Sequence, residues 1–256
     1  MRLRWLLVLA LVPALTPLPA AAQSLADIVA RVKPSIVGVG IYSPTARPPA
    51  QVQGTGFAVG DGSYVLTNLH VVPEKLKKKE KQELVIFIGT GNTAEARVVE
   101  LVMQDPDHDV AILKVPGAPL PALRLGDDEN VREGDAVAFT GFPIGAVYGL
   151  YPATHRGIVA AWTPIATPAI SPRQLSAKTI KRLKEEFFVF QLDATAFPGN
   201  SGSPLYRAET GEVIGIVSSV FVKESKENVL SSPSGITFAV PIRYARAALR
   251  EIGALP

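Results

Sequence analysis

Hydrophobic residues along this chain occur in short runs, and few of the runs have helical spacing. Runs of about four to eight such residues, separated by glycine, proline and charged residues, are typical of β-strands. One group of runs lies at 35–42, 56–59, 64–68, 83–88, 96–103 and 110–115. A second group lies at 135–140, 157–161, 187–192, 204–206, 212–221 and 235–240.

The segment between the two groups, residues 116–134, is rich in proline, glycine and charge and is predicted to be a crossing linker. Asp61-Gly62 predicts a tight hairpin between the second and third runs. Two groups of strands across a linker predict an all-β fold of two packed six-stranded antiparallel β-barrels. We expect the first barrel at about 35–115 and the second at about 135–241.

Helical spacing is confined to the margins of the chain. Apolar residues at 25–32 recur at i, i+3, i+4 and i+7, and 242–252 alternates apolar and basic residues, which predicts a short C-terminal helix. Residues 178–188 are a candidate for a third, charged helix. The lysine run at 75–81 is interpreted as a solvated loop, and 163–186 as a long exposed loop of undetermined role.

The first 22 residues resemble a secretory signal peptide. Arg2 and Arg4 precede an apolar core at 5–12, and small residues stand before Gln23. The alternative, an uncleaved anchor, needs about 20 apolar residues, and this run is shorter. We therefore expect cleavage after residue 22, a periplasmic or extracellular protein of residues 23–256, and no stable membrane insertion after cleavage.

Composition narrows the function further. The chain has 26 Lys and Arg against 23 Asp and Glu, and the leader contains two of the bases, so the processed chain is almost neutral. Nothing in this balance calls for nucleic acid or an anionic membrane as a partner. The absence of cysteine excludes disulfides, thiol catalysis and cysteine metal sites. An exported fold of this size must then depend on its hydrophobic core.

The strongest chemical signal is the sequence GNSGSP at 199–204. Acyl transfer by serine needs a hydroxyl close to backbone N–H groups that stabilise the tetrahedral oxyanion. Gly199, two residues before Ser201, can adopt the backbone angles that direct its N–H toward that oxyanion. Alone, the motif would be read as an ordinary turn.

Two further motifs change that interpretation. His70 follows an apolar run, and Asp109 opens another. The chain order His, Asp, Ser is one of the known triad orders, the one found on double β-barrels. Asp105 and Asp107 compete for the aspartate role, but Asp109 alone adjoins a strand that could bury it.

The other histidines are assigned no catalytic role. His155 precedes a strand of the second group and is expected to be a surface or structural residue, because the reaction needs one base. His108 with Asp105 and Asp107 suggests a metal cluster, but three residues in one short turn rarely complete a metal site. We predict no metal.

Several segments together resemble the HtrA/Deg family of trypsin-like peptidases. They are GTGFAV from Gly54, LTNLHVV from Leu66, DPDHDVAILK from Asp105, GNSG from Gly199, GEVIGI from Gly211 and GITFAVP from Gly235. The likeness extends from about residue 35 to residue 245. It implies a double barrel that acts on protein or peptide substrates without a cofactor.

Carried over position by position, the resemblance assigns the triad to His70, Asp109 and Ser201. It assigns the oxyanion hole to the backbone N–H groups of Gly199 and Ser201. It leaves a homo-oligomer, such as the trimers frequent in the family, open. Pro256 follows closely on the last predicted helix, so the PDZ domain common in the family is not expected here.

The resemblance also indicates a specificity pocket. It places Thr195 at the floor, and Ser218, Val220 and Gly235 on the walls. No acid stands at the floor to attract Lys or Arg, and Val220 narrows the entrance. The expected cleavage is therefore after small or medium aliphatic residues.

Two alternatives to an active peptidase were considered. One is a catalytically silent or latent protein of the protease fold that binds other proteins as a scaffold or chaperone; loss of triad residues would mark it, and no loss is visible. The other is an α/β-hydrolase esterase, which needs Gly-x-Ser-x-Gly, whereas Ser203 stands at the final position.

Overall fold

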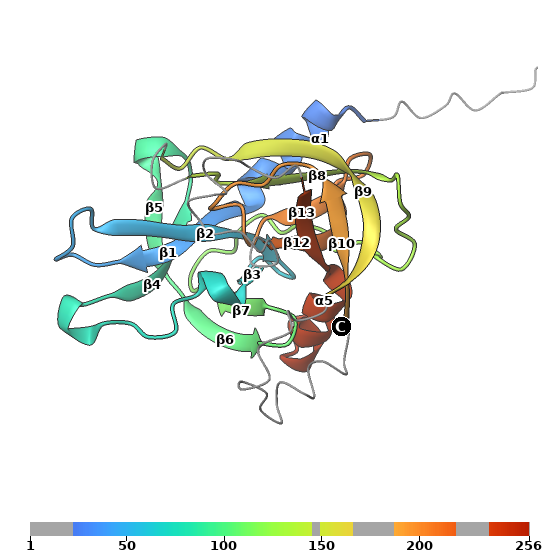
Figure 1. Ribbon diagram of the computed structural model, residues 1–256. Helices are drawn as coiled ribbons and strands as arrows, with labels where there is room; N and C mark the ends of the chain where they lie inside the picture. Colours follow the sequence, from blue (N-terminus) through green and yellow to red (C-terminus); the bar gives the residue numbers. More distant parts are fainter. Residues whose placement is uncertain (1–22, 145–148, 166–186, 219–235, 256) are drawn as a thin grey trace, which may run out of the picture.

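The computed structural model describes residues 23–144, 149–165, 187–218 and 236–255. In Figure 1 two β-sheets lie side by side, the first built from the blue and green part of the chain and the second from the yellow to red part. The strands of both sheets are paired antiparallel.

The first sheet has seven strands in the order β5-β4-β1-β2-β3-β7-β6. Their bounds are β1 Ile36–Tyr42, β2 Ala50–Val59, β3 Tyr64–Asn68, β4 Glu83–Ile88, β5 Glu95–Val98, β6 Glu100–Asp105 and β7 Val110–Lys114. The predicted hairpin joins β2 and β3, where the Gly62 N–H donates to the Val59 carbonyl and the Asp61 carboxylate accepts the Ser63 N–H. The Ser63 hydroxyl also donates to this carboxylate, and the two bonds, that of the hydroxyl first, lower the pKa of Asp61.

The two edge strands of this sheet, β5 and β6, belong to one stretch of chain. β5 pairs with β4 and β6 with β7, and Val99 alone lies between them. Val99 is buried, and its N–H donates to the Leu84 carbonyl at 3.0 Å. The single strand predicted at 96–103 is therefore bent. The sheet curls into a half-barrel, and this bend connects its two edge strands, β5 and β6.

The second sheet is a closed six-stranded barrel in the order β10-β13-β12-β11-β8-β9. Its strands are β8 Ala136–Gly141, β9 Ala153–Ile165, β10 Phe187–Asp193, β11 Pro204–Arg207, β12 Val213–Ser218 and β13 Ile236–Pro241. β9 is much longer than the predicted 157–161, because one end pairs with β8 and the other with β10.

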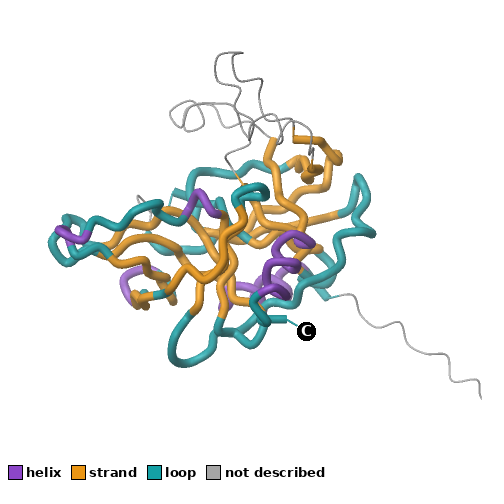
Figure 2. Tube along the Cα trace, turned by 90° about the horizontal axis from the view of Figure 1, so that it is seen from below, coloured by secondary structure: helices purple, strands orange, loops and turns teal. Residues whose placement is uncertain are grey.

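Two helices flank the sheets. α1 (Leu25–Val32) begins at a capping box in which Ser24 and Asp27 bond each other's backbone N–H groups. α5 (Ile242–Glu251) follows β13 directly and packs on β12 and on β7 of the first sheet. It therefore lies at the junction of the two sheets (Figures 1 and 2).

One hydrophobic cluster crosses that junction. It combines side chains of the first sheet, the second barrel and both helices, with Phe57, Ile112, Phe142, Ile216 and Leu249 among its fully or almost fully buried members. Separate clusters fill the remainder of each sheet. The all-β prediction with a short C-terminal helix is confirmed.

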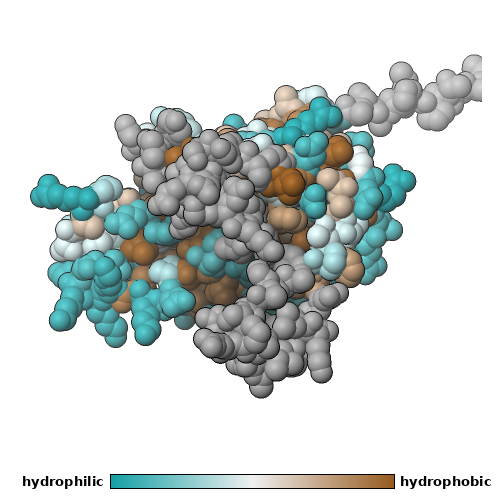
Figure 3. All heavy atoms as spheres, viewed as in Figure 1, coloured by the Kyte–Doolittle hydropathy of each residue, from teal (hydrophilic) through white to brown (hydrophobic). Residues whose placement is uncertain are grey.

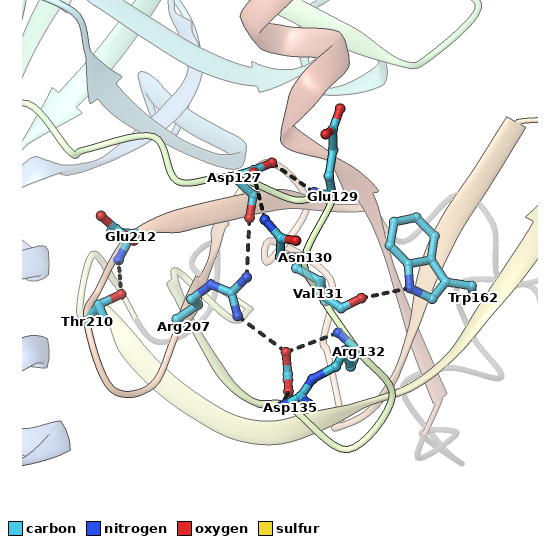
Figure 4. Close-up of polar contacts among 10 residues, drawn as sticks. All are labelled: Asp127, Glu129, Asn130, Val131, Arg132, Asp135, Trp162, Arg207, Thr210 and Glu212. Carbon is cyan, nitrogen blue, oxygen red and sulfur yellow. Dashed lines mark hydrogen bonds and ion pairs between the residues drawn. The ribbon is translucent and has the colours of Figure 1, made fainter.

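The linker is anchored to the second barrel by charged and polar side chains (Figure 4). Arg207 of β11 donates to the Asp127 carbonyl and pairs with Asp135. The Arg132 N–H also donates to Asp135, and this bond, with the charges of both arginines, lowers the pKa of that carboxyl. The Trp162 indole N–H of β9 donates to the Val131 carbonyl.

The end of the first sheet that lies on the left in Figure 3 carries many hydrophilic side chains. The lysine-rich loop at 75–81 lies there, and its lysines are all exposed. Within the described ranges no helix is long and apolar enough to cross a membrane. The predicted leader at 1–22 and most of the loop at 163–186 lie outside the described residues, as does the helix predicted at 178–188 except for Phe187 and Phe188, which belong to β10.

Candidate active site

His70 and Asp109 are brought together by the pairing of two strands. β3 ends at Asn68 and continues into one turn of 3-10 helix, Leu69–Val71, which contains His70. β7 begins at Val110, immediately after Asp109, and Val110 is the register partner of Asn68. The antiparallel pairing therefore places the end of β3 beside the start of β7.

The Asp109 carboxylate binds both the backbone and the ring of His70. Its Oδ1 accepts the His70 backbone N–H at 3.0 Å, and its Oδ2 lies 2.8 Å from Nδ1. An ionised carboxylate can only accept, so Nδ1 carries the proton and Nε2 of the neutral ring is left as an acceptor. This is the tautomer that a general base needs.

The backbone of Asp109 is held in an uncommon conformation. Its φ of 56° lies in the left-handed region that favours glycine. The Asp109 carbonyl accepts the Leu69 N–H and the Asn68 side-chain amide, both at 3.1 Å. These contacts retain a strained conformation that directs the carboxylate at His70.

The second barrel supplies a third donor to this carboxylate. Ser218, the fully buried last residue of β12, donates from its hydroxyl to Asp109 Oδ2 at 3.0 Å. The sequence analysis had assigned Ser218 to a pocket wall and missed this contact. A hydroxyl that ends an otherwise apolar buried strand, VIGIVS, was the available signal.

The competing acid Asp105 has a different partner. Its Oδ2 lies 2.6 Å from Nδ1 of His108, and its Oδ1 accepts the N–H groups of Asp107 and His108. The His108 ring stacks on Tyr244 of α5 at 3.8 Å. This second His–Asp pair closes the turn before β7.

Ser201 lies against the first sheet. The Thr55 N–H donates to the Ser201 carbonyl at 2.8 Å. A methyl group added at Gly54 would lie 2.9 Å from that same oxygen and 2.7 Å from a methyl carbon of Val71. Gly54 thus lets the residue after His70 and the backbone of Ser201 approach a single point of β2.

Thr55 orients the loop before Ser201. Its hydroxyl donates to the Gly199 carbonyl at 2.7 Å and accepts the Phe142 N–H at 3.0 Å. The sequence analysis did not identify Thr55. A fully buried polar residue between two glycines in a strand, GTG, was the signal that could have indicated it.

The peptide between Pro198 and Gly199 has a defined direction. The Ile144 N–H donates to the Pro198 carbonyl at 2.7 Å. Because a trans peptide holds its N–H opposite its C=O, the Gly199 N–H points away from Ile144. Gly199 has a φ of 98°, and a Cβ there would collide with the Phe142 carbonyl oxygen, so glycine is required at this position.

The predicted specificity pocket is described only in part. Thr195 is half-buried, six residues before Ser201. Ser218 bonds to Asp109 as described above. Val220 and Gly235 lie outside the described residues.

The family model of the trypsin-like peptidase domain matches residues 54–216. The chain belongs to this family. The match spans the segments that contain His70, Asp109 and Ser201.

Similar proteins carry matching names. A probable periplasmic serine endoprotease DegP-like of Pseudomonas putida is 33% identical over 196 residues, which are 77% of this chain and 34% of that protein. Serine protease HTRA1B of Danio rerio is 29% identical over 231 residues, 89% of this chain and 41% of that protein. The chain therefore spans between a third and a half of the length of these relatives.

Among solved structures, HtrA-type protease AlgW with tripeptide superposes with a TM-score of 0.62 and 25% identity. The superposition covers 90% of this chain and 64% of that one. The trypsin-like fold and the HtrA/Deg-type resemblance are thereby confirmed, and the chain is a member of a serine-protease family.

Proposed function

We propose that this chain is a serine endopeptidase that uses Ser201, His70 and Asp109 to form an acyl-enzyme. Ser201 Oγ attacks the scissile carbonyl while His70 Nε2 takes the hydroxyl proton. The imidazolium then protonates the leaving amine, and a water activated by His70 hydrolyses the ester. The Gly199 and Ser201 N–H groups stabilise the oxyanion of each tetrahedral intermediate.

The observation that carries this proposal is the double contact of Asp109 with His70. It supports the tautomer that leaves Nε2 available as a base, and Ser218 supplies a further donor to the carboxylate. The Gly199 peptide direction supports an oxyanion hole beside Ser201. A structural ion pair alone would not need the loop that contains Gly199 and Ser201 to be held against the same part of the first sheet.

The substrates we propose are unfolded or misfolded proteins in the periplasm, cleaved after small or medium aliphatic residues. The names of six relatives include the word periplasmic. Thr195 at the expected pocket floor carries no charge, which favours neutral side chains over Lys or Arg. The leader expected at 1–22 would direct export, and the family resemblance is compatible with a homo-oligomer such as a trimer.

The test uses the protein purified from the periplasm of an expression host. We expect a fluorophosphonate probe to label it and unfolded casein to be cleaved, with both lost in Ser201→Ala. Mass spectrometry of the intact protein should show a chain that begins at Gln23, and the peptide products should end in small or aliphatic residues.

Ser203→Ala is the matched control. It removes a fully buried hydroxyl two residues from Ser201, and both labelling and cleavage should persist. Labelling that persists in Ser201→Ala would refute the assigned nucleophile. A folded wild-type protein that binds casein but neither cleaves it nor reacts with the probe would identify a non-catalytic scaffold instead.

A further inference from the structure

The residue between the two proposed oxyanion donors, Asn200, has a fully buried side chain. Its backbone is fixed by two bonds, from its N–H to the Phe197 carbonyl and from the Ser203 N–H to its own carbonyl, both at 3.0 Å. A rotation about the Asn200 backbone would turn the Ser201 N–H and would displace the peptide that joins Asn200 to Gly199. The contacts of the Asn200 side chain therefore bear directly on the oxyanion hole.

Among the described residues that side chain has one hydrogen-bonding neighbour. Asn200 Nδ2 lies 3.5 Å from Nε2 of His155, whereas Asn200 Oδ1 is buried without a partner there. His155 is therefore the single polar group of the described structure that can set the direction of the amide.

The His155 ring is itself held firmly. It lies on β9 opposite its register partner Phe139 and stacks on that ring, with the ring centroids 4.8 Å apart and 17° between the planes. The centroid of the Phe197 ring lies 6.1 Å from that of His155. Phe197 also accepts the Asn200 N–H. The ring thus packs between the barrel wall and the loop that leads to Ser201.

We propose that His155 is a positioning residue for the peptidase reaction: its neutral ring accepts a hydrogen bond from the Asn200 side-chain amide and so fixes the backbone between the two oxyanion N–H groups. This inference rests on the proposed function. A neutral imidazole with its proton on Nδ1 accepts at Nε2, whereas the imidazolium has only donors. Protonation would set an N–H against the amide N–H, so the Asn200 side-chain amide would have to turn over or move away.

The surroundings of the ring favour the neutral form. Burial lowers the pKa of His155 below its usual value of about 6.5. The side chains that contact it within the described part of the chain, Phe139 from β8 and Phe197 and Asn200 from the nucleophile loop, do not ionise. The neighbouring charges are exposed and lie elsewhere: Arg156 follows on the other face of β9, and Asp193 pairs with Ile158 further along.

The inference predicts a specific pattern in the kinetics. Oxyanion stabilisation acts in the transition state, so His155→Ala should lower kcat about tenfold or more while KM changes less than about twofold. His155→Gln offers an amide acceptor and should restore kcat to within about threefold of wild type. Thermal unfolding of both variants would show that they are folded.

The pH profile distinguishes positioning from simple packing. The acid limb of kcat in the wild-type enzyme should include the protonation of His155, whose pKa is lowered by burial, and should be steeper there than a one-proton curve. In His155→Gln it should become a one-proton curve. Arg156→Gln, the same replacement on the opposite face of the strand, should keep the steep limb.

A measurement without turnover separates this inference from the proposed function. In Ser201→Ala protein the side-chain amide resonances of Asn200 should shift with pH as His155 titrates, and this shift should be absent when His155→Gln is added. Amide resonances that ignore the His155 titration would overturn the inference whether or not the enzyme is active. An unchanged kcat in His155→Ala, or a steep acid limb that persists in His155→Gln, would overturn it as well.

Discussion

The Asp109 carboxylate accepts hydrogen bonds from both sheets. Two of its contacts come from His70 of the first sheet and one from Ser218 of the second barrel. Hydrogen bonds to a charged group are typically worth about 1.5–3 kcal/mol. Each donor therefore contributes measurably to the orientation of the carboxylate and hence of the imidazole.

Removing the donor from the second barrel tests this account. In Ser218→Ala, Asp109 keeps both contacts with His70, so we expect kcat to fall about tenfold, equivalent to about 1.4 kcal/mol, with KM little changed. Steady-state kinetics on a peptide substrate give both constants. A rise in KM at constant kcat would instead favour the pocket-wall role predicted from the sequence, and Ser203→Ala is again the control.

At the scale of elements, the positions of most strands along the chain and their division into two groups followed from local patterns. Apolar runs ended by turn residues predicted most strand bounds to within one or two residues. The bend at Val99 was not predictable, because the residues around it keep a strand-like pattern on both sides. It is the long-range pairing of β5 with β4 and of β6 with β7 that makes one predicted strand into two.

Parts of the site escaped prediction for a similar reason. The sequence motifs identified His70, Asp109 and Ser201 as candidates, and these assignments stay predictions. The bond of Thr55 with Gly199 and that of Ser218 with Asp109 each join residues more than a hundred positions apart. No local motif encodes them. His155 was assigned a surface or structural role because the reaction needs one base, and nothing near it in sequence reveals Asn200.

The attachment of α5 to the linker also belongs to this scale. Arg243 Nε donates to Asp128 Oδ2 at 2.7 Å, and Asp128 is almost fully buried. The bond with Asp128 raises the pKa of Arg243. A second arginine of the helix, Arg246, donates to the Gly126 carbonyl.

Breaking this pair should destabilise the fold. Removing one partner of a buried pair costs about 3–5 kcal/mol, and because Arg243 is partly exposed we expect about 2 kcal/mol for Arg243→Met. Urea denaturation measures the change in the free energy of unfolding. Adding Asp128→Asn, which removes the stranded charge, should recover part of the loss; an additive further loss would contradict the pairing.

For the whole molecule, the hydrophobic cluster that crosses the junction makes the two sheets one cooperative unit. It contains buried residues from both sheets and from α5. We therefore expect one unfolding transition rather than one for each sheet. In the protein of residues 23–256, Trp162 is the single tryptophan, so its fluorescence reports the second barrel. Far-UV circular dichroism reports all strands, and the two urea midpoints should coincide. Midpoints that differ would show that the sheets unfold separately.

The packing of α5 on β7 also determines when in synthesis the site can form. Asp109 directly precedes β7, whose Val110 and Ile112 share a buried cluster with Leu249 of the helix. Because synthesis proceeds from the N-terminus, His70, Asp109 and Ser201 are made before residues 242–251. Until that helix arrives, β7 lacks part of its cover and Asp109 lacks a firm support. The strand that follows Asp109 therefore acquires its complete packing only after the chain has been made as far as its last helix.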